Sequence, residues 1–330
     1  MQTNLPSNYR AAAFEKPGAP ISIRQVEMKQ PRENENLVKT VFASLSSTDE
    51  VLRNDLAPSL HYPIGIKLAN GVVEYARVHT ECAIEIKKGE LQGREHEAPV
   101  LAYDAGRVLG SYRRCQRDWH AIDENERHMI REINERIGFG KHEGVIVVYG
   151  EGGFARLAID VLEKCEKERQ SSSGGGVMSM LFGSSGNQKM RVMLVTTSNR
   201  WTPSDYQLSD RDVLHVDKDN VGDKLKQTGG ANLVVCVDQP RQKFEQLLDG
   251  FRYNADVSIL SPSKNGEMQL PLGNILAKAL RTCRLVEKHN IRAPAKQHRF
   301  DQNEPNQAWR EMEHRSTFDA PVVVFQQGQQ

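Results

Sequence analysis

Residues 144–155 read GVIVVYGEGGFA, and this stretch decides the fold. Its first half, through Tyr149, is uncharged and largely apolar, which is typical of a parallel strand buried on both faces. A glycine-rich turn follows at once, and the mostly apolar residues 155–162 then predict a helix. Strand, turn and helix in this order predict a βα unit.

Further apolar strands follow along the chain. They are expected at 192–195, 233–237 and 257–260, with a helical segment at 244–251 before the last. Strands that alternate with helices are typical of a doubly wound parallel sheet. The sequence therefore predicts an α/β fold of the Rossmann type.

The turn after the first strand matches the G-x-G-x-x-G/A dinucleotide fingerprint at Gly150, Gly152 and Ala155. The first glycine permits the tight turn, the second lets a pyrophosphate approach, and the small third residue lets helix and strand pack closely. The free N–H groups at the helix start complete a site for phosphates. We expect Gly153 and Phe154 to take part in this cofactor site.

The second strand ends without the carboxylate that usually binds a ribose 2′-hydroxyl. Residues 196–200 read TTSNR instead. One interpretation is an ordinary polar turn. The other is a 2′-phosphate pocket formed by Thr196, Ser198 and Arg200, which predicts NADP(H), with NAD(H) as the alternative.

Charge and cysteine content narrow the function classes. Lys+Arg is 44 and Asp+Glu is 43, so no global basic field exists to bind nucleic acid or an anionic membrane. No run approaches the ~20 apolar residues of a membrane helix, and residues 1–10 hold no apolar signal core. The five cysteines are widely spaced without a C-x-x-C pair, which argues against disulfides and a structural zinc site. We expect a cytoplasmic protein.

Two further segments have distinct character. Residues 9–45 and 72–78 predict a β-rich region before the parallel sheet. Residues 170–189 contain two Ser/Gly tracts around the apolar stretch 177–182, which predicts an insertion. It is either a disordered surface segment or a docking peptide, because an apolar cluster is costly to expose.

Several stretches together resemble the medium-chain dehydrogenase/reductase family, which includes zinc alcohol dehydrogenases and quinone reductases. They are residues 11–18, 37–44, 71–78, 148–153, 228–237, 306–312 and 322–325. The resemblance implies a Rossmann domain at 138–285, carrying the insertion at 170–189, and a truncated, β-rich GroES-like domain formed by 1–137 and 286–330. It also implies that Val237 and Leu260 line the cofactor site and that the protein is a homodimer.

Two departures from the family pattern concern zinc. Members that use zinc place Cys-His before Thr/Ser-Asp after the second core strand, but residues 45–49 read LSSTD here. Residues 62–70 then run almost directly into the strand at Gly71, so the family's Gly-His-Glu segment and structural zinc lobe are missing. Because the thiolate and imidazole that would coordinate a catalytic zinc are both missing, we expect no metal.

Two hypotheses for function remain. The first is a zinc-independent, NADP(H)-dependent reductase of an activated carbonyl, enone or quinone, with Ser47, Thr48 or Tyr62 supplying a proton. The alternative is that each of these residues only contributes a hydroxyl to a turn. The second is a non-catalytic scaffold, or pseudoenzyme, that binds protein partners and retains at most nucleotide binding. The complete glycine turn favours the first, and the lost lobe and the 170–189 insertion favour the second.

Overall fold

The computed structural model describes residues 6–13, 19–45, 68–80, 91, 93–136, 138–139, 144–171, 190–196, 198–238, 244–261, 295–301, 304–314 and 319–325. The chain divides into two compact units. Unit 1 comprises Met1–Ala102, Pro262–Cys283 and Ala293–Gln330, and unit 2 comprises Tyr103–Ser261 and Arg284–Arg292. Residues 103–137 therefore lie with the parallel sheet, whereas the sequence-based limits assign them to the β-rich domain.

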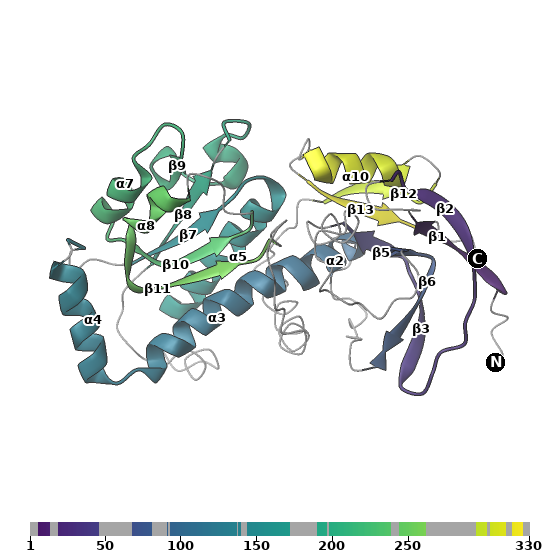
Figure 1. Ribbon diagram of the computed structural model, residues 1–330, viewed down its shortest axis with the longest axis horizontal. Helices are drawn as coiled ribbons and strands as arrows, with labels where there is room; N and C mark the ends of the chain where they lie inside the picture. Colours follow the sequence, from purple (N-terminus) through teal and green to yellow (C-terminus); the bar gives the residue numbers. More distant parts are fainter. Residues whose placement is uncertain are drawn as a thin grey trace. The chain divides into compact units, whose positions relative to one another are not determined.

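Unit 2 is built on a five-stranded sheet in the order β11-β10-β7-β8-β9, in which every pairing is parallel (Figure 1). The strands are β7 (Val145–Tyr149), β8 (Arg191–Thr196), β9 (Val213–His215), β10 (Ala231–Cys236) and β11 (Phe251–Ile259). This order confirms the predicted Rossmann-type sheet. The strands that follow β7 are placed first on one side of it, as β8 and β9, and then on the other side, as β10 and β11. Ligands of open α/β sheets bind at such a switch in strand order, which lies here between β7 and β10.

Helices cover the sheet on both sides. They are α3 (Gly106–Ala121), α4 (Glu124–Arg136), α5 (Gly152–Ser171), α7 (Val221–Gln227) and α8 (Glu245–Leu248). Val145, Val147 and Tyr149 share one core with residues of α7 and α8. Because side chains alternate along a strand, Ile146 and Val148 face the opposite side, and α5 packs directly on β7 and β8.

Helix α3 contains two glycines, a residue type that disfavours helices. Gly106 and Gly110 are both buried, and α3 packs against α5 and β10. Glycine lowers helix propensity by about 1 kcal/mol relative to alanine. Tertiary packing of the buried face of the helix offsets this loss.

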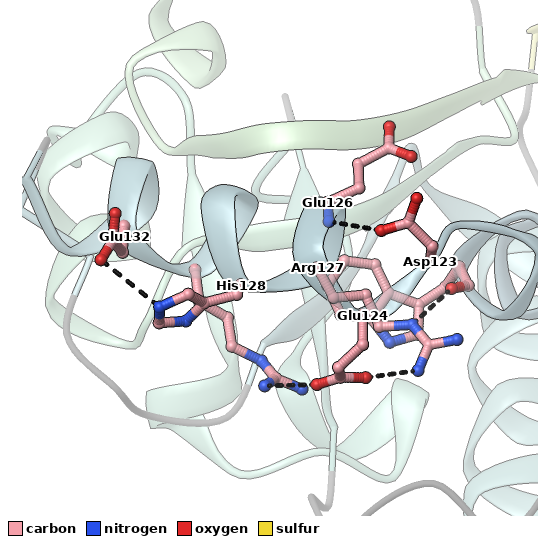
Figure 2. Close-up of polar contacts among 8 residues, drawn as sticks. Asp123, Glu124, Glu126, Arg127, His128 and Glu132 are labelled. Atoms are coloured by element: carbon pink, nitrogen blue, oxygen red, sulfur yellow. Dashed lines mark hydrogen bonds and ion pairs between the residues drawn. The ribbon is translucent and has the colours of Figure 1, made fainter.

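Helix α4 starts at a side-chain cap. Asp123 accepts a hydrogen bond from the N–H of Glu126 at 2.9 Å, as an N-cap carboxylate does (Figure 2). Arg127 pairs with Glu124 at 2.9 Å, and His128 lies 3.5 Å from Glu132 one turn along the helix. These are exposed pairs that support the helix by a few tenths of a kcal/mol each. The helix ends at Arg136.

Unit 1 contains three small sheets, ordered β2-β1-β5, β12-β13-β4 and β3-β6. The strands are β1 (Asn8–Ala13), β2 (Ser22–Glu27), β3 (Glu35–Lys39), β4 (Phe42–Ser44), β5 (Leu68–Val73), β6 (Tyr75–His79), β12 (Ala295–Arg299) and β13 (Ala320–Val324). Short helical turns η2 (Glu95–Glu97), α2 (Ala98–Val100) and η3 (Leu101–Ala105) follow β6, and α10 (Glu304–His314) lies between β12 and β13. The C-terminal strand β13 pairs with β4, so the end of the chain returns to the N-terminal unit.

Within the predicted β-rich region, residues 37–43 and 72–78 are each divided between two strands. The breaks meet at Glu74, whose carbonyl accepts a hydrogen bond from Thr40 N–H at 2.8 Å. The Glu74 carboxylate also accepts from the backbone N–H of Arg10 at 2.7 Å and pairs with its guanidinium at 2.6 Å. Glu74 therefore fixes the corner at which β5 becomes β6.

The core of unit 1 lies between its sheets and α10. It contains Trp309 and Ala308 of α10 together with Val323, Phe325 and Phe300, and the rings of Phe300 and Phe325 are 4.3 Å apart. Among the described residues of both units, none of the helices is long and apolar enough to cross a membrane.

Candidate functional site

The candidate site is the glycine turn (Gly150–Gly153), which joins β7 to α5. Gly150 has φ of 144° and Gly152 has φ of 74°, values that residues with a side chain rarely adopt. Ala155 is fully buried in the first turn of α5. The backbone therefore has the left-handed turn and the close helix–strand contact that a dinucleotide fingerprint requires.

The two glycines face different surroundings. A Cβ on Gly150 would lie 2.5 Å from Cγ2 of Val237, so this position is closed by the strand end next to it. A Cβ on Gly152 would meet nothing within 4 Å. The space in front of Gly152 is therefore open, as a turn that receives a pyrophosphate requires.

Two amides of the turn are already hydrogen-bonded within the chain. The N–H of Glu151 donates to Oδ2 of Asp238 at 3.0 Å, and the N–H of Gly152 donates to the hydroxyl oxygen of Tyr206 at 3.1 Å. Asp238 follows β10, and its own N–H contacts the carbonyl of Tyr149 at 3.4 Å. The two N–H groups that would donate to phosphate oxygens thus already donate to a carboxylate and to a phenol hydroxyl.

Tyr206 is held in place by a short 3-10 turn, η5 (Pro203–Tyr206), which is closed by a capping box between Thr202 and Asp205. Arg156 of α5 donates to the carbonyl of Asp205 at 3.1 Å, which ties the turn to the helix. Tyr206 is 1% exposed. Burial raises its pKa, the bond from Gly152 lowers it, and the carboxylates of Glu151 and Asp238 raise it further, so the phenol stays protonated.

The first turn of α5 also contacts a buried cation. The guanidinium carbon of Arg107 lies 5.9 Å from the ring centre of Phe154 and 4.9 Å from that of Tyr103. Its side chain is 4% exposed and lies 3.8 Å from Asp104. Burial raises the pKa of Asp104 to about 6, and Arg107 lowers it in part. Phe154 therefore anchors α3 to α5 through a cation–π contact.

The predicted 2′-phosphate loop follows β8. Thr196 is 2% exposed, and its hydroxyl accepts from Ser198 N–H at 3.2 Å and lies 3.3 Å from the Ser198 carbonyl. The Ser198 hydroxyl in turn accepts from the N–H of Arg200 at 3.0 Å. Thr196 thus shapes the loop, Ser198 is half-buried, and Asn199 and Arg200 are exposed.

No family model matches the chain. A stretch of 46 residues is 44% identical to alcohol dehydrogenase 2 of Caenorhabditis elegans, which spans 14% of this chain and 13% of that protein.

Similarity to solved structures extends over almost the whole chain. The alcohol dehydrogenase of Aeropyrum pernix is 12% identical with a TM-score of 0.63, covering 96% of this chain and 99% of that one. RspB, a short chain alcohol dehydrogenase from E. coli CFT073 complexed with NADH, is 12% identical with a TM-score of 0.62, covering 97% and 100%. CurK enoyl reductase is 10% identical with a TM-score of 0.59, covering 96% and 99%. The chain has the medium-chain dehydrogenase/reductase fold.

Within this fold, the predicted cofactor residues gather at the carboxyl ends of the parallel strands. Val237 and Leu260 follow β10 and β11, are 2% and 8% exposed, and the N–H of Leu260 donates to the Cys236 carbonyl at 2.8 Å. The turn after β7 and the loop after β8 lie at this same edge. The structure therefore brings the predicted cofactor residues to one edge of the sheet.

The predicted catalytic hydroxyls Ser47, Thr48 and Tyr62 lie outside the described residues, as do 46–49 of the segment where zinc ligands were expected. In the described part of the chain no three His, Cys, Asp or Glu side chains are grouped to hold a metal ion. The zinc-free reaction stays a prediction.

Sequence reasoning missed Asp238, Tyr206 and Arg107. A signal existed for Asp238, since it directly follows a buried strand of a predicted parallel sheet. Tyr206 and Arg107 offered none, because their roles come from contacts with residues about fifty positions away.

Proposed function

We propose that this chain is a nicotinamide-dinucleotide-dependent oxidoreductase that prefers NADP(H) and reduces an activated carbonyl, enone or quinone without zinc. The observation that carries the proposal is the left-handed Gly152, with φ of 74° and open space before it, at the switch in strand order of a parallel sheet. The bound dinucleotide would supply the hydride.

In this proposal, residues of the chain bind the dinucleotide and orient it. The glycine turn and the start of α5 receive the pyrophosphate, and Ser198 and Arg200 receive the 2′-phosphate. Val237 and Leu260 exclude water from the strand ends, since both are buried. Ser47, Thr48 and Tyr62 remain the predicted sources of the proton.

The test is a titration of NADPH and NADH against purified protein, read by nicotinamide fluorescence and followed by turnover of an enone. Gly152→Val is expected to lose binding, because its side chain fills the open space in front of the turn. Gly93→Val is the matched control: Gly93 also has φ of 74° and open surroundings, but lies in unit 1. Equal binding by wild type and Gly152→Val would contradict the proposal.

A second candidate function is the non-catalytic scaffold. It is favoured by the contacts of Asp238 and Tyr206, which satisfy the turn without a ligand. A scaffold would bind neither dinucleotide at millimolar concentration and would work through a protein partner. The same titration separates the two functions.

We further propose a homodimer in the cytoplasm. Strand β11 ends the sheet in the described part of the chain and exposes Val257 and Ile259 at 44% and 50%. Exposed apolar side chains on an edge strand favour association. Cys115, Cys165 and Cys236 are buried free thiols, as in proteins of reducing compartments. Sedimentation of wild type and a Val257→Lys, Ile259→Lys double variant tests the dimer, which the variant should lose.

A further inference from the structure

Asp238 and Tyr206 occupy the amides on which a dinucleotide pyrophosphate would depend. Each accepts from a successive N–H of the glycine turn, at 3.0 Å and 3.1 Å. A helix start leaves its first N–H groups without partners inside the helix, and the usual partners are caps, water or an anion. In this chain the partners come from the segments after β10 and β8.

We propose that Asp238 and Tyr206 form a latch on the glycine turn, and that Asp238 sets the affinity for any dinucleotide because the pyrophosphate must displace it. The inference rests on the proposed function. It assigns a role in specificity to a residue that does not belong to the fingerprint.

The two residues of the latch act unequally. Asp238 is half-buried and carries a negative charge toward the place of the pyrophosphate, and the carboxylate of Glu151 lies in the turn itself. Like charges in a partly buried site repel more strongly than in water. Tyr206 is neutral, so its hydroxyl competes for one hydrogen bond without repelling the ligand.

The position of the Asp238 backbone also favours the latch. The N–H groups of Val237 and Asp238 both point at the Tyr149 carbonyl, at 3.0 Å and 3.4 Å, so the backbone bearing Asp238 is fixed beside the end of β7. Rotation of the Asp238 side chain frees the N–H of Glu151, and the N–H of Gly152 becomes free when Tyr206 is displaced as well. A ligand that displaces Asp238 loses one charge-assisted hydrogen bond of the free protein.

The experiment compares three latch variants with two controls. Asp238→Ala removes charge and acceptor, Asp238→Asn removes the charge and keeps an acceptor, and Tyr206→Phe removes the hydroxyl. Asp210→Ala and Tyr253→Phe make the same changes at exposed positions of unit 2. NADPH dissociation constants are measured together with amide hydrogen exchange of the peptide containing residues 150–153.

We expect Asp238→Ala to bind NADPH at least tenfold more tightly than wild type, and Asp238→Asn to gain most of that increase. Tyr206→Phe should gain less. Exchange at the turn should become faster in Asp238→Ala and Tyr206→Phe without ligand, and both controls should match wild type.

The outcomes separate the inference from the proposed function. If wild type does not bind but Asp238→Ala does, the latch stands and the scaffold function replaces the oxidoreductase. If wild type binds and Asp238→Ala binds equally or more weakly, the oxidoreductase stands and the latch is wrong. If none of the proteins binds, or exchange at the turn is unchanged, the latch is overturned, because removing it opened nothing.

Discussion

The carboxylate of Glu166 accepts a hydrogen bond from the backbone N–H of Met190 at 3.2 Å, and so joins α5 to the residue that precedes β8. Residues 172–189 separate the end of α5 from Met190 in the sequence and lie outside the described residues. The predicted insertion 170–189 thus begins with two residues, Gln170 and Ser171, that belong to α5. The two ends of the connection are held together by a bond that does not involve the segment between them.

We predict that a short Gly-Ser connection can replace residues 172–189 with little effect on folding. Connections between a helix and a strand usually need ~2–6 residues, and the contact of Glu166 with Met190 remains in the shortened chain. The melting temperature should stay within a few degrees of wild type. A large decrease would show that the segment packs into unit 2, and unchanged stability with lost assembly would mark it as a docking peptide.

Glu166 itself should be among the most important side chains for stability. It is 3% exposed, accepts from the Tyr112 hydroxyl at 2.6 Å and pairs with Arg169 at 2.9 Å. Glu166→Ala removes this acceptor from a half-buried cation and a buried phenol, and such losses cost on the order of 3–5 kcal/mol. Glu163→Ala is the control on the same helix, since its pair with Lys167 at 4.0 Å is more exposed. Urea denaturation should show a loss below ~1 kcal/mol for the control.

The sequence predicted the parts of this fold that local pattern determines. The β7–turn–α5 unit could be predicted because an uninterrupted apolar strand and the glycines stand next to each other. Helix α3 could not, because Gly106 and Gly110 lower local propensity and only their burial shows that packing offsets it. The break at Glu74 was missed for a similar reason, since its cause is Arg10, 64 positions away.

The same distinction holds for the site. Residues 150–155 form one local motif, so their place in the fold followed from the sequence. The contact of Glu151 with Asp238 joins residues 87 positions apart, and no periodicity contains it. The contacts that occupy the amides of the turn therefore became visible only in three dimensions.

The two glycines of the turn should differ in their effect on stability. Gly152→Ala places a Cβ in open space but keeps φ of 74°, which costs about 1–2 kcal/mol. Gly150→Ala also forces a Cβ to within 2.5 Å of Val237, and overpacking adds roughly 1–3 kcal/mol. Urea denaturation of both variants should rank Gly150→Ala as the less stable. The reverse order would mean that the contact with Val237 relaxes without loss.

Asp104 should make folding stability fall as pH rises from about 4 to about 6. Burial raises its pKa from 3.8 to about 6, so within this window the folded protein retains a proton that the unfolded chain has lost. The difference amounts to at most about 3 kcal/mol. Asp104→Asn should remove this part of the pH dependence in urea denaturation, and the exposed Asp118→Asn should not. Identical slopes for wild type and Asp104→Asn would contradict the assignment.

Arg200 should decide between NADP(H) and NAD(H). Residues 196–200 contain no carboxylate to repel a 2′-phosphate, and the hydroxyl of Thr196 is engaged by Ser198. Among the described residues of this loop, Ser198 and Arg200 are the two that we predict to contact the phosphate. A charge-assisted hydrogen bond contributes about 1.5–3 kcal/mol, and solvent at the exposed Arg200 favours the lower value, which is roughly a tenfold preference.

The measurement is the ratio of the NADH to the NADPH dissociation constant. Wild type should give a ratio of about ten, because only NADPH carries the phosphate that Arg200 can neutralise. Arg200→Ala should bring the ratio close to one while NADH binding stays the same. Arg211→Ala removes a guanidinium that is 83% exposed further along the connection between β8 and β9, and should leave the ratio as in wild type. A wild-type ratio near one, or one that Arg200→Ala does not change, would exclude the phosphate pocket, and a ratio below one would assign the loop to NAD(H).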